Sequence, residues 1–455
     1  MHNAATTSRQ HAIALSRELA AESLALAPAD PLTARRLAVA AWRVLPTDQA
    51  LSAMTTLLTE QQQEGILPSD SGVGGVAFSP DGKLLATAGG EGTIRLWNPA
   101  TGQAVGAPLA AVTGPGLAVT AVAFSRDGKL LASGDSHGTV RLWNPATRQP
   151  VGVLLADATG PGFAVNSVAF SPDGKLLASA YTDGTVRLWN PATRQLVETP
   201  LPAATYSSST LGATAVAFSP DGRLLATADG DGNVWLWNPA TGQPVGIPLP
   251  AGGGNAATAV AFSRDGRLLA TADADGNVRL WNPATGQLVR APLPADTGPG
   301  GGVLGVAFSP DGTLLASADA DGTVRLWNPA TGKPVRAPLP AGTGPEDGVL
   351  GVAFSPDGKL LATADGDGTV WLWNPATGQP VGIPLPAGGG NAATAVAFSP
   401  DGKVLASAGA DGTVRTWQVS LFVAPYAALC ADVGPPTKAN WTQYAPVEHQ
   451  PGVCG

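Results

Sequence analysis

The segment Gly134 to Gly138 combines residue types that could perform nucleophilic catalysis. It fits the G-x-S-x-G pattern, in which a Ser on a sharp turn between a strand and a helix attacks an acyl group, and it also contains His137. Similar segments elsewhere in the chain read ADADG or ADGDG and lie between two β-type runs, not before a helix. We therefore predict that Ser136 is a turn residue and that the chain is not an enzyme.

Other patterns that could bind a nucleotide or a metal are incomplete. Every Gly-Lys pair precedes Leu, Pro or Val, whereas a phosphate-binding P-loop needs Ser or Thr there. Four His are scattered along the chain, which is too few for a His-rich metal site in the repeats. The Asp-x-Asp-Gly turns, such as Asp229 to Asn233, start like a calcium loop but lack its closing Glu. We predict structural turns, with no metal and no cofactor.

One recurrent position could bind a partner. An Arg stands two residues before a repeated Trp in six places: Arg95, Arg141, Arg187, Arg279, Arg325 and Arg415. These Arg could ring one face and bind anions, although a structural role is the more ordinary interpretation of such charges. Trp235 and Trp371 replace the Arg in two repeats. With Asp229 and Asp365 they are candidate partner-binding residues, because aromatic side chains often anchor interfaces; packing against the next repeat is the alternative.

An internal repeat supplies the elements that position these residues. The phrase VAFS, followed by Pro or Arg and then Asp-Gly, places Phe at 78, 124, 170, 218, 262, 308, 354 and 398. Nineteen residues after each Phe stands a Trp: Trp97, Trp143, Trp189, Trp237, Trp281, Trp327, Trp373 and Trp417. The distance from each Trp to the next Phe varies from 25 to 29 residues. All length variation therefore falls in one connection, which we predict to be a surface loop.

Each unit reads as four short strands separated by turns. VAFS, LLATA or LLASA, TVRLW and PVGIPL are β-compatible runs, and Gly, Asp, Asn and Pro stand between them. Four short antiparallel strands cannot bury both faces alone, so each unit must stack on its neighbours. Closing the stack into a ring leaves only short, protected edges.

These units resemble WD repeats, a family of β-propellers with about 40 to 45 residues per unit, over residues 65–418. The resemblance implies an all-β, eight-bladed WD-repeat β-propeller with a small N-terminal α-helical segment and a short helical C-terminal tail. It also implies a hydrogen-bonded tetrad of Trp, Ser or Thr, Asp and His in each blade. The Trp would be those named above, and the hydroxyls Thr87, Ser133, Ser179, Thr227, Thr271, Ser317, Thr363 and Ser407. The acids would be Asp183, Asp231, Asp275, Asp321, Asp367 and Asp411.

The chain departs from this family pattern in two ways and also contains a duplication. Glu91 and His137 stand at the acid position of the first two repeats, and the tetrad His is missing from every repeat. We therefore expect looser, partly hydrated Asp turns. Residues 218–263 recur as 354–399 with two differences. The duplication predicts two equivalent surfaces, three blades apart, each carrying the same loop and the same additional Trp.

We predict three regions: a helical segment at 1–63 with two to three helices, the propeller at 64–419, and a C-terminal tail at 420–455. Leu15, Leu19 and Leu26 share a helix face, Asp30-Pro31 has the form of a helix start, and Pro46-Thr47 begins a third segment. Such helices resemble those beside the WD-repeat sensor of multidomain bacterial signalling proteins, here without the signalling NTPase. The eighth unit lacks the Asn-Pro-Ala-Thr-Gly turn, so we predict that residues 64–69 supply its outer strand.

Composition narrows the classes of partner. The net charge of −8 and isoelectric point near 5.0 argue against nucleic acid, whose binding needs clustered Lys and Arg. No apolar run is long enough to span a membrane, and we expect a cytoplasmic, monomeric ring with Cys430 and Cys454 as free thiols. We predict a non-enzymatic scaffold or sensor platform that binds a protein or peptide on its loop face. The alternative is a small-ligand-binding or enzymatic propeller with a site at the central channel.

Overall fold

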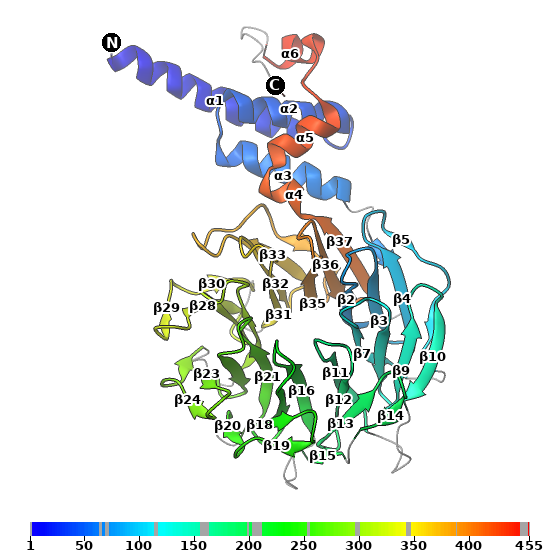
Figure 1. The fold of residues 1–455 in the computed structure, drawn as a ribbon. Coiled ribbons are helices and arrows are strands. Elements are labelled where there is room, and N and C mark those ends of the chain that lie inside the picture. Colours follow the sequence, from blue (N-terminus) through cyan, green and yellow to red (C-terminus); the bar gives the residue numbers. More distant parts are fainter. Residues whose placement is uncertain are drawn as a thin grey trace. The chain divides into compact units, whose positions relative to one another are not determined.

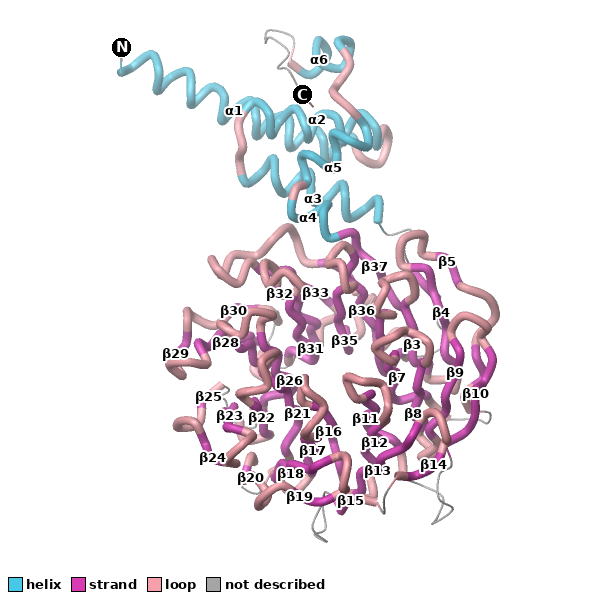
Figure 2. Tube along the Cα trace, in the orientation of Figure 1, coloured by secondary structure: helices cyan, strands magenta, loops and turns pink. Residues whose placement is uncertain are grey.

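The computed structural model describes residues 2–62, 66–68, 72–112, 117–154, 163–197, 200–202, 212–252, 255–295, 301–342, 347–387, 389–445 and 454. Two compact units are present. The first consists of residues 1–65, 380–385 and 417–455, and the second of residues 66–379 and 386–416. Figures 1 and 2 show helices in the first unit and a ring of short strands in the second.

The second unit is an eight-bladed β-propeller, as the sequence predicted. Eight inner strands surround the centre of the ring (Figure 1): β2 (Val73–Phe78), β7 (Val119–Phe124), β11 (Val165–Phe170), β16 (Ala213–Phe218), β21 (Ala257–Phe262), β26 (Val303–Phe308), β31 (Val349–Phe354) and β35 (Ala393–Phe398). Each pairs antiparallel with a second strand: β3 (Leu85–Gly89), β8 (Leu131–Asp135), β12 (Leu177–Tyr181), β17 (Leu225–Asp229), β22 (Leu269–Asp273), β27 (Leu315–Asp319), β32 (Leu361–Asp365) and β36 (Val404–Gly409).

The third strands carry the repeated Trp: β4 (Thr93–Asn98), β9 (Val140–Asn144), β13 (Thr185–Asn190), β18 (Asn233–Asn238), β23 (Asn277–Asn282), β28 (Thr323–Asn328), β33 (Thr369–Trp373) and β37 (Thr413–Gln418). The outer strand is a single run in β10 (Gln149–Leu154) and β34 (Leu385–Pro386). In the other five of the first seven blades it is split in two: β5 (Gln103–Ala104) with β6 (Leu109–Ala110), β14 (Gln195–Leu196) with β15 (Leu201–Pro202), β19 (Gln243–Pro244) with β20 (Leu249–Pro250), β24 (Gln287–Leu288) with β25 (Leu293–Pro294), and β29 (Lys333–Pro334) with β30 (Leu339–Pro340).

The eighth blade takes its outer strand from the beginning of the ring sequence. β1 (Ile66–Pro68) pairs antiparallel with β37, with Ile66 opposite Arg415 and Pro68 opposite Thr413. The prediction that residues 64–69 supply this strand is therefore confirmed for the three described residues. The pairing protects the edge of β37 and joins the two ends of the ring sequence within one sheet.

Hydrophobic side chains between neighbouring blades hold the ring together. Between blades 4 and 5, for example, Ala226, Val234 and Leu236 pack against Leu269 and Trp281. The second strands are buried along their whole length. Small Ala residues in these strands leave room for the large Trp of the next blade, so the packing is complementary in size.

The first unit is a helical bundle that combines both ends of the chain. It contains α1 (His2–Leu26), α2 (Pro31–Val44), α3 (Asp48–Gln62), α4 (Val419–Val423), α5 (Pro425–Val433) and α6 (Lys438–Tyr444). The Asp30 carboxylate accepts from the backbone N–H of Thr33 and caps α2, as the sequence predicted. Met54 and Leu58 share one core with Leu429 and Trp441. The predicted tail is thus part of the same unit as the N-terminal helices.

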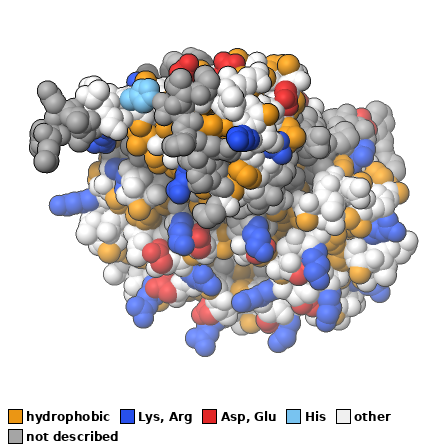
Figure 3. All heavy atoms as spheres, turned by 90° about the horizontal axis from the view of Figure 1, so that it is seen from above, with side chains coloured by type: hydrophobic (Ala, Val, Ile, Leu, Met, Phe, Trp, Pro, Cys, Tyr) orange, Lys and Arg blue, Asp and Glu red, His pale blue; other side chains and the backbone are white. Residues whose placement is uncertain are grey.

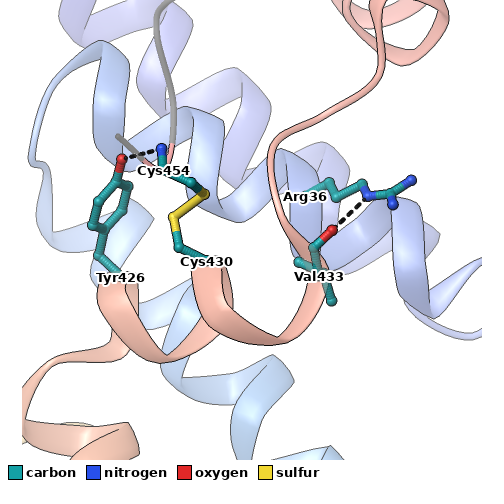
Figure 4. The surroundings of a disulfide bond; sticks show 5 residues. All are labelled: Arg36, Tyr426, Cys430, Val433 and Cys454. Atoms are coloured by element: carbon teal, nitrogen blue, oxygen red, sulfur yellow. Dashed lines mark hydrogen bonds between the residues drawn. A yellow bond between two sulfur atoms is a disulfide. The ribbon is translucent and has the colours of Figure 1, made fainter.

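Cys430 and Cys454 form a disulfide, so the expectation of two free thiols was wrong. Figure 4 shows the surroundings of the bridge: the Tyr426 hydroxyl accepts from the backbone N–H of Cys454, and Arg36 Nε donates to the carbonyl of Val433. Both Cys also pack against the core of the helical unit, so their proximity comes from tertiary packing and is not contained in the sequence alone. No helix in the described part of the chain is both long and apolar enough to cross a membrane.

Candidate interaction face of the ring

The repeated Trp side chains form the predicted hydrogen bonds with the hydroxyls of the second strands. In blades 1 to 7 the indole Nε1–H donates to the Ser or Thr ten residues earlier, over 2.8 to 3.3 Å. In the eighth blade, Trp417 and Ser407 both have interaction partners. These pairs are buried, so the hydroxyls and the Trp are structural residues rather than binding residues.

The buried acid of the blade is not the one that the sequence predicted. The fully or almost fully buried acids are Asp135, Asp229, Asp273, Asp319 and Asp365, at the end of the second strand. The predicted residues lie two positions later: Asp231 and Asp275 donate their backbone N–H to the first acid, and Asp183, Asp321, Asp367 and Asp411 accept from a Thr in the same turn. Side chains two residues apart in a strand share a face, which puts the first acid beside the hydroxyl, as with Asp319 and Ser317.

The Arg of the third strand pairs with three of these acids, which supports the structural interpretation of the Arg positions over anion binding. Arg141 lies 2.8 Å from Asp135 and Arg325 lies 2.6 Å from Asp319, and Arg279 pairs in the same way with Asp273. Blades 1, 3 and 8 have no acid at the first position. In blades 3 and 8, Arg187 and Arg415 pair with Asp183 and Asp411 instead.

The Arg also ties neighbouring blades together. Arg279 Nη1 donates to the carbonyl of Ala251, and Arg415 Nη1 donates to that of Ala387. Both carbonyls directly follow the outer strand of the preceding blade. The guanidinium thus joins the acidic turn of its own blade to the residue that follows the outer strand of the preceding blade.

Blades 4 and 7 lack this link. Trp235 stacks on Trp237 with ring centroids 5.5 Å apart, and Trp371 stacks on Trp373 at 5.4 Å. Both additional Trp are half-buried and pack against the preceding blade. The sequence left open whether they are exposed or packed against the next repeat; they are packed, but on the preceding blade, and part of each side chain remains exposed.

Asp229 and Asp365 are fully buried in these two blades. Asp229 Oδ2 and Asp365 Oδ1 have no hydrogen-bond partner, and neither has the indole Nε1 of Trp235 or Trp371. Burial, together with the charges of Asp367 and Asp347, raises the pKa of Asp365 to about 8. Burial also raises the pKa of Asp229.

The variable connections meet the acidic turns at the same end of the blades. In blade 4, Ala251 and Gly252 donate their N–H groups to the carbonyl of Gly232. Gly232 has a φ of +82°, and an added Cβ would lie 2.3 Å from the carbonyl oxygen of Asn255. The connection after blade 4 therefore folds over the turn between the second and third strands of that blade. We call the surface formed by these turns and connections the Asp-turn face.

The segment around Ser136 belongs to this face and does not form a nucleophile elbow. It connects β8 with β9, so a strand rather than a helix follows it. Ser136 Oγ accepts from the backbone N–H of Ala118, and the His137 N–H donates to Asp135. The second hydrogen bond lies within the turn, and the first fixes the turn to the connection that precedes β7.

At the opposite ends of the blades, the Asp of each turn interacts with a hydroxyl and usually with a Lys or Arg of the same turn. Ser79 Oγ donates to Asp81, and Lys83 lies 3.7 Å from the same carboxylate; the arrangement recurs around the ring. Hydrogen bonds from the Ser keep the pKa of these Asp below its usual value. Figure 3, a view from above, shows Lys and Arg side chains with acidic ones between them on the visible surface, without one continuous basic patch.

Two pockets of about 290 and 420 Å³ lie among these turns, on either side of Arg126. Ser125, which lines the first, donates to Asp127 and accepts from the N–H of Leu130. The pockets thus consist of turn residues that are already hydrogen-bonded to one another. Within the described residues, no group of three or more His, Cys, Asp or Glu is arranged to hold a metal ion.

The fold and its repeated Trp–hydroxyl pairs define a β-propeller of the WD-repeat class, and comparisons with known proteins agree. Residues 72–297 match the family model described as "IFT122 first beta-propeller". Residues 292–328, 337–374 and 385–418 match the model "WD domain, G-beta repeat". The chain belongs to the WD-repeat β-propellers.

Two individual proteins are similar to parts of the chain. The crystal structure of the computationally designed Ika8 protein has a TM-score of 0.62 and 27% identity, covering 77% of this chain and 97% of that one. A protein named NAD(+) hydrolase ApTIR, from Actinoplanes sp., is 35% identical over 102 residues. That match covers 22% of this chain and only 14% of the hydrolase, so the chain spans a small part of that relative.

Proposed function

We propose that the chain is a non-enzymatic interaction platform that binds a protein or peptide through the Asp-turn face. The observation that carries this proposal is the meeting of the acidic turns with the variable connections at one end of the blades. Connections carried on a rigid framework are the usual sites of binding in such folds. The framework is rigid because each blade buries its second strand completely.

Charge favours this face over the opposite one. On the opposite face each acid has a hydroxyl donor and, in most blades, a Lys or Arg of the same turn. On the Asp-turn face Asp231 and Asp275 are accessible, and in blades 4 and 7 no Arg is available to neutralise the acids. A partner with basic side chains therefore fits best, since charge complementarity steers association.

Three further expectations from the sequence stay proposals. The absence of enzymatic activity is supported by the use of Ser136 in a turn. The segment shared with the Actinoplanes relative is 14% of that protein, which is too little to transfer its activity to this chain. A role as a sensor region of a bacterial signalling protein rests on resemblance. The cytoplasmic location stays a prediction, and the disulfide between Cys430 and Cys454 argues against it, since disulfides persist mainly in oxidising compartments.

The experiment identifies a partner by co-purification and mass spectrometry and then measures its affinity for two matched variants. Asp231→Asn/Asp275→Asn removes two charges from the Asp-turn face of blades 4 and 5 and should weaken binding about tenfold, or about 1.4 kcal/mol. Asp221→Asn/Asp265→Asn removes two charges from the opposite face of the same blades and should leave the affinity unchanged. A loss confined to the second variant would move the binding site to the opposite face.

A further inference from the structure

Three other blades show which side chain pairs with the buried acid at the end of the second strand. In blades 2, 5 and 6 this acid pairs with a guanidinium from the same blade, namely that of Arg141, Arg279 or Arg325. The Asp side chains are at most 2% exposed and the Arg side chains 15 to 24%. A charge-assisted bond of this kind compensates for the burial of the carboxylate.

Blades 4 and 7 keep the acid and lose the guanidinium. Asp229 Oδ1 accepts from the backbone N–H groups of Asp231 and Asn233, whereas Oδ2 has no partner. Asp365 Oδ2 accepts from the hydroxyl of Thr369 over 3.3 Å, whereas Oδ1 has no partner. Each copy of the duplicated segment thus has one carboxylate oxygen without a partner, and an unpaired buried acceptor is unfavourable.

The Trp that replaces the Arg does not satisfy the acid but offers a surface suited to a cation. The indole Nε1 of Trp235 and of Trp371 is buried without a partner, so neither indole donates to its Asp. Each indole stacks on the next Trp of its strand and remains partly exposed. Aromatic faces attract guanidinium and ammonium groups, and Arg187 over the ring of Tyr181, at 4.2 Å from the centroid, is an instance in blade 3.

The local charge also favours a cation. Asp367 and Asp347 act electrostatically on Asp365, and Asp231 acts on Asp229. Within the described residues neither Asp229 nor Asp365 has an ion-pair partner. Metal coordination does not account for these acids, because the described residues contain no suitable ligand group.

We propose that Asp229 with Trp235, and Asp365 with Trp371, form two equivalent receptor positions for Arg side chains of the protein partner. Each position takes a guanidinium from outside in place of the one that sister blades supply themselves. This assignment rests on the proposed function, because it identifies the chemistry of the partner on the Asp-turn face. The two positions are three blades apart. A partner that presents two Arg at the matching separation would occupy both positions and bind more tightly than a partner with one Arg, because the second contact becomes intramolecular.

The first test uses a defined probe, the blocked peptide acetyl-Gly-Gly-Arg-Gly-Gly-amide, with citrulline and Lys versions as controls. Binding is followed through the indole N–H signals of Trp235 and Trp371 in nuclear magnetic resonance spectra, assigned with Trp→Phe variants. The Arg peptide should shift both signals with a stoichiometry of two, and the uncharged citrulline peptide should bind at least tenfold more weakly. Equal responses to Arg and citrulline, or tighter binding of the Lys peptide, would overturn the guanidinium assignment.

Substitutions that copy one blade onto another provide the second test. Trp235→Arg/Trp371→Arg gives both blades their own guanidinium, as in blade 5, and should abolish peptide binding while the ring stays folded. Arg279→Trp should create a third position and raise the stoichiometry to three. Undiminished binding by the double variant would refute the proposal even if Arg279→Trp failed to fold.

The two proposals can fail separately. If Asp231→Asn/Asp275→Asn weakens the identified partner but Trp235→Arg/Trp371→Arg does not, the Asp-turn face binds the partner without the receptor positions, and this inference is wrong. If the Arg peptide binds as expected but neither variant weakens the partner, the receptor positions exist and the proposed function of the face is wrong.

Discussion

At the scale of single residues, one substitution in an otherwise repeated position changes the electrostatics of a whole blade. Arg279 and Trp235 occupy equivalent positions in β23 and β18. The Arg keeps its buried acid paired, whereas the Trp leaves Asp229 with an unsatisfied oxygen. A buried carboxyl without a cation favours its neutral form, which makes the stability of these two blades dependent on pH.

Asp229→Asn/Asp365→Asn should flatten the pH dependence of stability. The pKa of Asp365 is about 8 in the folded chain against 3.8 for the ordinary side chain, and burial also raises the pKa of Asp229. A raised folded-state pKa gives a contribution that is present below about pH 4 and is lost as the pH rises to 8. The free energy of unfolding of the wild type should therefore fall between pH 5 and 8 by on the order of a few kcal/mol, as measured by urea denaturation.

The matched control for this prediction is Asp221→Asn/Asp357→Asn in the same blades. Hydrogen bonds from Ser219 and Ser355 lower the pKa of these exposed Asp, so their contribution is lost only as the pH falls below about 4. The control should keep the wild-type slope between pH 5 and 8. Identical slopes in both variants would show that the buried acids do not determine the pH dependence.

Neighbouring Trp residues in blade 4 should respond differently to the same substitution. Trp237 donates to Thr227 over 3.0 Å, whereas the Nε1 of Trp235 has no partner. Trp237→Phe should therefore lower the free energy of unfolding by about 1 kcal/mol more than Trp235→Phe, because it also leaves the buried Thr227 hydroxyl without its hydrogen-bond donor. Chemical denaturation of the two variants measures this difference, and a larger loss for Trp235→Phe would contradict it.

At the scale of secondary-structure elements, the closing strand shows how a short segment can determine the integrity of a ring. β1 contains three residues, yet it covers the edge of β37 and completes the fourth position of the eighth blade. Without it, β37 would present unpaired N–H and C=O groups along an open edge.

A pair of truncations isolates the contribution of β1. Removing residues 1–62 and removing residues 1–70 both delete α1 to α3, but only the longer truncation deletes β1. The longer truncation should lower the Tm of the ring by on the order of 5 °C relative to the shorter one. Circular dichroism of the β signal during heating is the measurement; equal Tm values would mean that β1 does not contribute to closure.

At the scale of the whole molecule, the chain contains two units with different means of stabilisation. The ring depends on repeated blade-to-blade packing, in which one pattern of Ala, Leu and Trp recurs at each interface. The helical unit is small, combines both chain ends around one core, and carries the disulfide between Cys430 and Cys454. Small units gain proportionally more from a covalent link, because their hydrophobic core is limited.

Loss of the disulfide should destabilise the helical unit and leave the ring unaffected. The two Cys are 24 residues apart in sequence, and a link across that separation stabilises by about 3 kcal/mol. Cys430→Ser/Cys454→Ser should lower the temperature at which helical signal is lost, while the β signal melts as in the wild type. The comparison of the two signals in one experiment separates the units; a parallel shift of both would show that they unfold together.

The sequence by itself determined the number of blades, the strands within them and the closing strand. It could do so because these features depend on local periodicity and on a fixed distance of 19 residues between Phe and Trp. The Asp30 cap of α2 was predictable for the same reason, since a cap and its helix are adjacent in the chain.

Only the tertiary structure decided which Asp of each turn is buried, where Trp235 and Trp371 pack, and that Cys430 meets Cys454. The burial of Asp229 rather than Asp231 depends on the strand face that it shares with Thr227 and on the Arg or Trp of the next strand. The packing of Trp235 depends on the blade before it, and the disulfide depends on the packing of both Cys against the helical core. Burial, packing and disulfide pairing depend on contacts between residues that are distant in the sequence, and a local sequence pattern does not identify those contacts.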